Sequence, residues 1–379
     1  MCISDEKNTM ASFWRQLTWS LRSLWRGTWP TVDSDGKRIR DSKAGTLLAG
    51  GYYCILWCIK GDLEYFSKTL KLEHSSSRTP CIKCRCDRSH TPWTQVNPES
   101  SSWLQAKWEQ DAWIAAHPRT PEIFTLPGVG IDSIGVDWMH TKHLGSDQYL
   151  FGSALMMLVS PTEGKRMMPD SPSVNMANLW AELALETKRL GIKHAYAEIK
   201  MSMFAPAAGR FPVLKGKAAE VRSLARPLLK VWEAKMDVSD RQHRLVRLAL
   251  HSSAELENIL DQHSSEYRLS GESSEAFRKL CWSYAACVSA LGQYFHLKGI
   301  WLFHFTIKTH YLIHCGLDCE ELSPRVGWCY SGEDMMSKVK LLVQGSCRGT
   351  SAQKLVSKVM FKYMVGMSFN VMTCDSWWR

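Results

Sequence analysis

The positions of apolar residues divide the start of the chain into a helix, a loop and a strand. Large apolar side chains such as Phe13 and Leu17 recur every three or four positions within residues 10–26, which predicts an amphipathic helix. A polar, turn-rich stretch follows and predicts a loop. Residues 51–62 then read GYYCILWCIKGD, and this run of aromatic and β-branched residues predicts a buried strand that ends at Asp62.

Helix and strand patterns alternate beyond this strand. Residues 63–72 predict a short helix, residues 74–102 a loop rich in Cys, Ser and Pro, and residues 103–117 another helix. The segment IDSIGVDWMH predicts a short strand that ends at Asp137. A glycine-containing turn at His143–Gly145 then leads into YLFGSALMMLVS, which has the length of a helix.

The second half of the chain has a long, helical and more polar pattern. It predicts helices over 174–190, 218–235, 238–263 and 273–298, and then over 303–315, 333–344 and 351–366. No strand pattern interrupts the first four of these helices. The sequence therefore predicts a predominantly helical α/β protein, in which a mixed core is interrupted by an all-helical insertion and then resumes.

Five segments follow from this layout. They are 1–49, an N-terminal helix and loop; 50–172, the first part of the core; 173–300, the helical insertion; 301–350, the return to the core; and 351–379, a C-terminal helix and tail.

Charge and composition narrow the class of partner. Hydrophobic residues make up 45% of the 379 residues, an ordinary globular proportion, and the formal net charge is +10. Residues 186–250 contain 14 Lys and Arg against six Asp and Glu, a local net of +8. Such a surface favours DNA as a partner, although a solvated face of ordinary helices has the same composition. The candidate DNA-binding residues are Lys215, Lys217, Arg222, Arg226 and Lys230.

Cysteine usage favours metal binding over disulfide formation. The chain has 13 cysteines, no apolar secretion signal at its start and no apolar run of the roughly 18 residues that span a membrane. We therefore expect a nuclear or cytoplasmic protein, neither secreted nor membrane-bound, whose clustered cysteines are metal ligands.

Two short motifs together supply a zinc donor set. Cys81 and Cys84 form a CxxC, which offers two thiolates from one tight turn, and zinc requires two further ligands. His310 and His314 are four residues apart on a predicted helix, so both imidazoles lie on one face. Free thiols and packed histidines are the alternative interpretation. Three other side chains remain alternative ligands: His74, Cys86 and His90.

Acidic residues at two element ends are candidate ligands for a catalytic cation. Asp137 follows a short apolar strand, although it could equally cap the next helix. Glu333 opens a predicted helix, where acids are also favoured by the helix dipole. Asp132 and Asp334 are possible replacements for these two carboxylates.

In their order and spacing, these motifs resemble the cut-and-paste DNA transposases of the CACTA (En/Spm) type and their relatives, including the recombinase of antigen-receptor rearrangement. Asp137-Trp-Met-His140 resembles the D-x-x-H turn of that family, and the CxxC lies upstream of it, as in the family. A K-x-H-x3-H helix, here starting at Lys308, precedes the last glutamate, here Glu333, which follows His314 by 19 residues. The resemblance covers roughly residues 50–350, and each motif is short.

The resemblance implies an RNase H-like core with a helical insertion and two-metal phosphoryl transfer on DNA. Three carboxylates would hold two Mg²⁺ ions, and a structural Zn²⁺ would tie the K-x-H-x3-H helix to the CxxC loop. Asp137 and Glu333 match the second and third carboxylates. A homodimer is also a possible state of such a protein.

The first carboxylate is where the chain departs from the family pattern. An RNase H-like sheet has two further strands between the one with the first carboxylate and the one with the second, whereas one convincing strand, ending at Asp62, precedes Asp137 here. Either Asp62 is the first carboxylate in an unusual sheet, or the core is truncated or degenerate. Three functions therefore stay open: a transposase, a non-catalytic zinc-stabilised nucleic-acid-binding protein derived from one, and a helical interaction protein.

Overall fold

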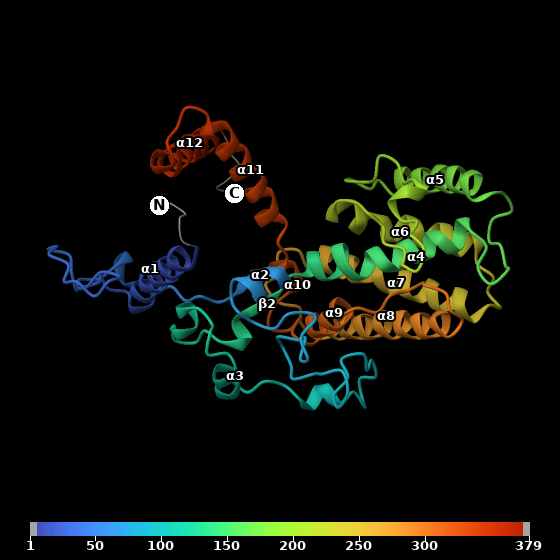
Figure 1. Ribbon diagram of the computed structural model, residues 1–379, viewed down its shortest axis with the longest axis horizontal. Helices are drawn as coiled ribbons and strands as arrows, with labels where there is room; N and C mark the ends of the chain where they lie inside the picture. Colours follow the sequence, from blue (N-terminus) through green and yellow to red (C-terminus); the bar gives the residue numbers. More distant parts are fainter. Residues whose placement is uncertain (1–5, 374–379) are drawn as a thin grey trace. The chain divides into compact units, whose positions relative to one another are not determined.

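The computed structural model describes residues 6–373, which form two compact units (Figure 1). One unit consists of residues 6–57, 120–129 and 329–373. The other consists of Cys58–Arg119 and Gly130–Trp328. The five segments expected from the sequence divide the chain differently, and that division stays a prediction.

The first unit is built around three long helices in its described residues. They are α1 (Glu6–Arg26), α11 (Tyr330–Cys347) and α12 (Ala352–Thr373). α1 contacts the 3-10 helix Glu122–Thr125, where Arg22 donates a hydrogen bond to Thr125 Oγ1 at 2.8 Å. α11 and α12 pack against each other. All three helices were expected from the periodicity of the sequence.

A small parallel sheet joins two distant parts of the second unit. β1 (Ile59–Gly61) pairs with β2 (Ile134–Val136), with Gly61 opposite Val136. Gly135 allows the close approach of these strands, because a Cβ there would lie 2.5 Å from Cys58 Sγ. The fold is therefore predominantly helical α/β, as expected, while the RNase H-like sheet stays a prediction.

The strand expected over residues 51–62 is much shorter in the structure. Ile59–Gly61 forms β1, whereas Tyr52 and Tyr53 are 82% and 71% exposed and belong to the first unit. Aromatic and β-branched residues are typical of strands, but a strand also needs a partner, and β2 is only three residues long.

The helix expected over residues 103–117 is divided. A 3-10 helix covers Ser102–Gln105 and α3 covers Gln110–Ala116. Between them, Lys107 forms a bridge with Cys84, and Arg85 N donates to the Ala106 carbonyl at 2.7 Å. These backbone contacts to the CxxC loop take the place of helical hydrogen bonds.

The turn expected at His143–Gly145 is part of a π-helix. The π-helix spans Met139–Ser146 and runs directly into α4 (Asp147–Val159). Lys142 and His143 within it are fully buried and bond to charged partners. This widened turn leads the chain from the end of β2 into the helical core.

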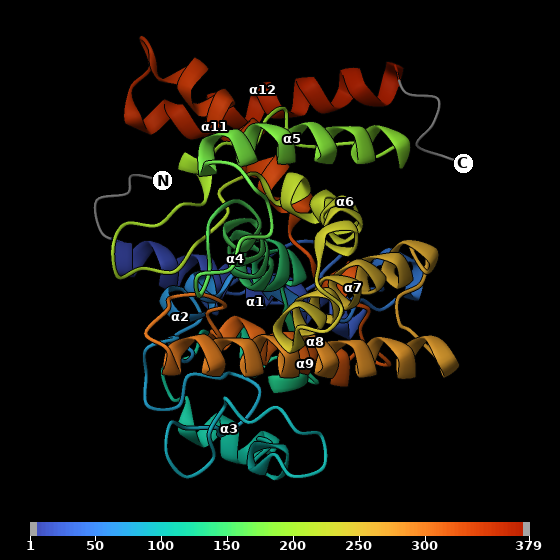
Figure 2. The same ribbon diagram turned by 90° about the vertical axis from the view of Figure 1, so that its right-hand side faces the viewer.

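The helical block consists of four helices in a row, each packed against the next (Figure 2). They are α5 (Pro172–Arg189), α6 (Ala218–Lys235), α7 (Arg241–Gln262) and α8 (Gly271–Leu297). In α6, Val221, Leu224, Leu228 and Trp232 recur at helical spacing and are all buried. No strand interrupts the described residues of this block, as the sequence predicted.

Two further helices complete the second unit: α9 (Ile307–Leu317), which packs against α8, and the short α10 (Pro324–Gly327). The six-residue helix α2 (Leu63–Lys68) follows β1. Gly316 lets α9 approach α8 closely, because a Cβ at this position would lie 3.0 Å from Cys281 Cβ. Among the described helices, none is long and apolar enough to cross a membrane.

Candidate metal centre and carboxylate pair

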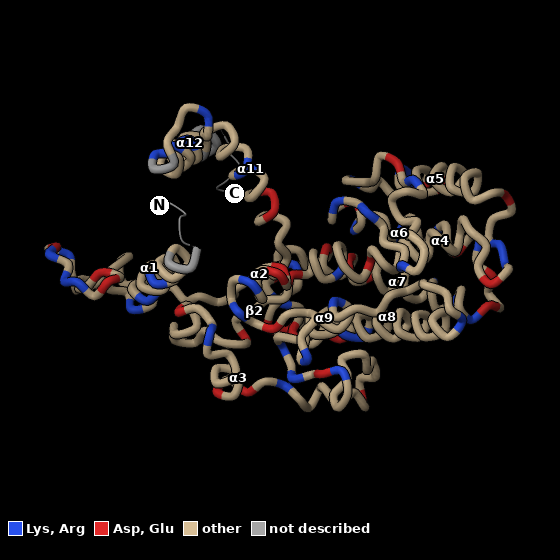
Figure 3. Tube along the Cα trace, in the orientation of Figure 1, with Lys and Arg blue, Asp and Glu red and all other residues tan. Residues whose placement is uncertain are grey.

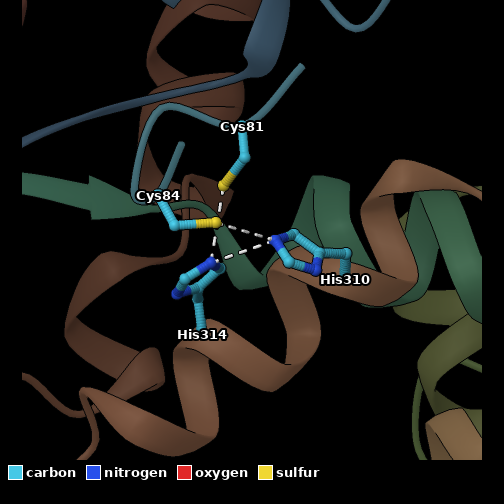
Figure 4. A group of neighbouring side chains, drawn as sticks. All are labelled: Cys81, Cys84, His310 and His314. Atoms are coloured by element: carbon cyan, nitrogen blue, oxygen red, sulfur yellow. Dashed lines mark hydrogen bonds between the residues drawn. The ribbon is translucent and has the colours of Figure 1, made fainter. Parts of the chain in front are cut away.

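Four metal-ligating side chains from two distant segments converge in the second unit (Figure 4). Cys81 and Cys84 come from the CxxC loop, and His310 and His314 come from α9. Each thiol sulfur lies 3.4 Å from one imidazole, Cys81 from His314 Nε2 and Cys84 from His310 Nε2. The two Nε2 atoms are 3.1 Å apart, and all four ligand atoms lie within 4.8 Å of one another.

These separations fit a tetrahedral zinc site. Zinc bonds of about 2.0 Å to nitrogen and about 2.3 Å to sulfur place neighbouring ligand atoms roughly 3.3–3.8 Å apart. The two sulfur–nitrogen distances of 3.4 Å fall in that range, and the nitrogen–nitrogen distance of 3.1 Å is slightly shorter. Two thiols and two imidazoles are also the donor types that zinc prefers. The group is therefore a possible metal site, and the donor set chosen from the sequence is the one that converges.

Hydrogen bonds hold the CxxC loop against α9. Lys83 N donates to Cys81 Sγ at 3.3 Å, which keeps the loop in a tight turn. The Tyr311 hydroxyl accepts a hydrogen bond from Ile82 N at 2.8 Å and donates one to the Pro80 carbonyl at 3.2 Å. Tyr311 therefore fixes the loop from a position between the two histidine ligands on the same helix.

Burial favours the neutral form of these side chains. All four are buried, with exposures between 0 and 3%. Burial raises the pKa of Cys81 well above its usual value and lowers the pKa of His314 to about 3. Neutral imidazoles are the form that binds zinc, and a bound divalent cation deprotonates a coordinating thiol.

The alternative ligands lie in different surroundings. His74 and His90 are exposed, and their Nδ1 atoms contact Ser76 Oγ at 2.7 Å and Ser89 Oγ at 3.0 Å. Cys86 is fully buried, and its thiol contacts that of Cys81. Cys86 is thus a neighbour of the four-residue group.

The aromatic side chain of Trp103 covers the two histidine ligands. The Trp103 ring packs edge-on against His310 and tilted against His314, with centroid distances of 4.5 and 5.1 Å. Burial lowers the pKa of His310 well below its usual value, and the backbone of Trp93 acts weakly in the opposite direction. Trp103 excludes water from the histidine ligands, and this favours a structural zinc site over a catalytic one.

The two aspartates chosen from the sequence follow neighbouring parallel strands. Because Gly61 pairs with Val136, Asp62 and Asp137 occupy equivalent positions at the carboxyl ends of β1 and β2. Asp62 Oδ1 accepts a hydrogen bond from Tyr65 N at 2.6 Å, and Asp137 Oδ1 accepts one from Met139 N at 2.9 Å. Each aspartate therefore also caps the segment that follows it.

His140 and Lys308 surround this carboxylate pair. His140 Nδ1 bonds to Asp137 Oδ2, and this hydrogen bond raises the pKa of His140. Burial lowers the pKa of Lys308, while Asp62 and Asp137 act on it in the opposite direction. The four side chains thus lie within electrostatic reach of one another.

A cavity of about 610 Å³ opens beside the pair. Asp62, His140, Tyr149 and Lys308 line it, whereas Asp137 is only 2% exposed. Ligand sites in open α/β sheets typically lie outside the carboxyl ends of the strands, as this cavity does.

The third carboxylate belongs to the other unit. Glu333 is in the first turn of α11, and Asp334 next to it pairs with Lys338 at 2.7 Å. Asp132, the other alternative, is exposed on a 3-10 helix before β2. Convergence of Glu333 with the two aspartates stays a prediction.

The five candidate DNA-binding residues differ in whether neighbouring side chains bond to their charged groups. Arg222 bonds to Glu257 Oε2 at 2.7 Å and to Asp261 Oδ1 at 2.5 Å, so acids compensate its charge. Lys230 pairs with Glu233 at 3.1 Å, and Arg226 donates to Asn258 Oδ1 at 2.7 Å. The other two, Lys215 and Lys217, are exposed. Basic and acidic positions are mixed across the helical block (Figure 3).

A buried charge cluster escaped the sequence analysis. Lys142 Nζ, fully buried, lies 2.7 Å from Asp147 Oδ2 and 3.2 Å from Glu257 Oε1. The same Glu257 oxygen accepts hydrogen bonds from Trp138 Nε1 at 2.9 Å and from His143 Nε2 at 2.8 Å. α7 therefore holds the segment that follows Asp137. Its members come from segments far apart in the chain, so the sequence carried no signal for it.

Comparison with protein-family models, with curated proteins and with solved structures found no match to this chain.

Proposed function

We propose that this chain is the core of a DNA-processing protein of the transposase type. In this proposal one Zn²⁺ ion is structural, and Asp62 and Asp137 hold a divalent cation at the reaction site. The observation that carries the proposal is the register of the small sheet, which places both aspartates at the carboxyl ends of adjacent parallel strands. A cavity large enough for part of a nucleotide lies beside Asp62.

The zinc ion has a structural role in this proposal. Its ligands join segments that are 226 and 233 residues apart in the chain, and they are fully enclosed. Two residues before His310, the same helix carries Lys308, which lines the cavity. Zinc at this position would fix one wall of the reaction site.

The donor set also fits Mg²⁺. Carboxylate oxygens are the ligands that Mg²⁺ prefers, and each oxygen has two lone pairs. Asp62 lines the cavity, and the hydrogen bond from Tyr65 N leaves its carboxylate with capacity for a cation. When bound, Mg²⁺ would stabilise the negative charge that develops on a phosphate during transfer.

Residues of the chain itself position the Asp137 carboxylate. The hydrogen bond from His140 Nδ1 orients the Asp137 carboxylate, and His140 itself lines the cavity. The buried cluster around Glu257 holds the π-helix on which His140 lies. The pair of aspartates is thus supported from two sides, as a preorganised site requires.

Mn²⁺ binding and DNA cleavage together test this function. We expect the zinc-loaded protein to bind Mn²⁺, followed by electron paramagnetic resonance, and to nick DNA when Mg²⁺ or Mn²⁺ is present. Asp62→Asn and Asp137→Asn should both abolish Mn²⁺ binding and nicking while zinc content stays unchanged. Glu275→Gln, which alters an exposed acid on α8, is the matched control. Wild-type levels of Mn²⁺ binding in both aspartate variants would refute the metal site.

A non-catalytic nucleic-acid-binding protein is the second candidate. Both aspartates cap the segments that follow them, and this is a structural role sufficient to explain their positions. This candidate predicts zinc, DNA binding that weakens with salt, and no cleavage with either cation.

A further inference from the structure

The cavity beside Asp62 combines a cationic side chain with unpaired donors on one wall. Lys308 lines this wall, and its ammonium group donates to the Leu144 carbonyl at 2.8 Å. An ammonium group has three N–H donors, so two remain after this one hydrogen bond in the described chain. The Lys308 stem is fixed by Gly145, where a Cβ would lie only 2.6 Å from Lys308 Cδ.

The start of α9 adds donors to the same wall. Thr306 and Ile307 line the cavity next to Lys308, and Thr306 does not cap the helix with its side chain. The Thr306 hydroxyl oxygen is shielded from solvent, so it does not face the open cavity. The first turn of a helix, however, carries backbone N–H groups without helical partners.

Carboxylates also lie at this cavity. Asp62 lines it, and Asp137 is hydrogen-bonded to His140, which lines it too. A divalent cation held by these carboxylates would neutralise their charge, and a phosphate group could then bridge the cation and Lys308. Without the cation, the carboxylates would repel the same phosphate.

We propose that the cavity binds a phosphate group of the DNA backbone, with Lys308 as its protein-side cation. This inference rests on the proposed function for the divalent cation and names the residue that contacts the substrate. The two non-bridging oxygens of a backbone phosphate can bond to a lysine and to a cation at the same time. The cavity of about 610 Å³ also has room for the attached sugar.

Chemical protection of lysines tests the contact in the unaltered protein. The zinc-loaded chain is treated with an acetylating reagent, alone, with a DNA duplex and with inorganic phosphate, each with and without Ca²⁺. We expect the duplex to protect Lys308 in the presence of Ca²⁺, with much weaker protection in its absence. Lys279, exposed and paired with Glu275 on α8, should react equally in every sample.

The outcomes separate this inference from the proposed function. If the duplex binds and Lys308 stays as reactive as before, the phosphate contact is wrong and a DNA role stands. If inorganic phosphate protects Lys308 and the duplex does not bind, the cavity is a site for free phosphate and the DNA role is wrong. If the duplex does not bind and neither reagent protects Lys308, both are overturned.

Variants supply a second, independent measurement. Lys308→Gln should weaken duplex binding to a similar extent for every sequence and reduce the salt dependence of the binding constant by about one phosphate contact. Lys308→Arg retains the charge and should keep most of the affinity, and Lys279→Gln should change nothing. Because His310 is nearby, zinc content is measured for each variant, and an unchanged salt dependence in zinc-loaded Lys308→Gln would overturn the inference.

Discussion

At the scale of single residues, Tyr311 links the two halves of the metal site through one hydroxyl group. Tyr311→Phe removes the acceptor of Ile82 N and the donor to Pro80, and a buried unpaired N–H costs about 1–3 kcal/mol. We expect zinc affinity to fall by about 10–100-fold, measured by competition with a chelating dye. Tyr294→Phe, which removes a hydroxyl that contacts Glu163, is the control. Unchanged zinc affinity in Tyr311→Phe would show that the loop needs no such support.

His117 should make stability depend on pH. Its Nε2 lies 2.6 Å from Glu73 Oε1 and its Nδ1 lies 2.6 Å from the Trp113 carbonyl, so both nitrogens donate when the ring is charged. Burial lowers the pKa of His117, but the hydrogen bonds to Glu73 and to the Trp113 carbonyl, together with the charge of Glu73, outweigh it, and the pKa is raised.

A raised pKa stabilises the folded state most where the unfolded ring is already protonated. The contribution should be full below about pH 6.5, the ordinary value for histidine, and should be lost as the pH rises through the raised value. We expect urea unfolding of the zinc-loaded protein to show this loss, and His117→Gln to remove it. The same pH profile in His117→Gln would assign the loss to another group.

Lys142 is the residue whose loss should cost most. Lys142→Met leaves Asp147 buried without its cation, which costs about 3–5 kcal/mol of unfolding free energy. Chemical denaturation measures this cost, with Lys279→Met as the exposed control that should have no measurable effect. A loss below about 1 kcal/mol would mean that Asp147 is protonated or reached by water.

The metal ligands could be predicted from the sequence, and the charge cluster could not. CxxC and HxxxH are motifs in which the spacing itself brings donor atoms together. Lys142 is on the π-helix and Glu257 is on α7, and no sequence spacing relates two segments so far apart in the chain.

At the scale of elements, helices were predicted far better than strands. α6 spans Ala218–Lys235, the predicted range, because its apolar residues repeat within the segment itself. The strand predicted over residues 51–62 is four times as long as β1. β1 has only three residues because pairing with β2 limits it. The π-helix was missed, since one extra residue per turn leaves no apolar repeat to detect.

The contact between α8 and α9 should be sensitive to a single methyl group. Gly316→Ala places a Cβ 3.0 Å from Cys281 Cβ and 3.1 Å from its sulfur, so overpacking should cost about 1–3 kcal/mol. Gly345→Ala is the control, because no atom lies within 4 Å of its Cβ position and alanine favours a helix. Thermal unfolding compares the two variants, and equal or higher stability in Gly316→Ala would show that the helices can separate at no cost.

At the scale of the whole molecule, three long-range links assemble the second unit. The sheet joins β1 to β2, the metal ligands join the CxxC loop to α9, and the charge cluster joins the π-helix to α7. The metal link was expected from the two motifs, because the CxxC lacks two ligands that the histidine pair can supply, whereas the pairing of β1 with β2 was not predicted. An RNase H-like sheet stays a prediction, since the described residues contain two strands.

The central claim is that one zinc ion holds α9 against the CxxC loop and so builds the wall of the cavity. Zinc analysis with X-ray absorption spectroscopy of the purified chain tests it most directly. We expect one zinc ion per chain, with two sulfur ligands at about 2.3 Å and two nitrogen ligands at about 2.0 Å. Cys84→Ser should reduce the zinc content sharply, whereas Cys86→Ser should not. Zinc absent from the wild-type chain, or bound without the two sulfur ligands, would contradict the claim.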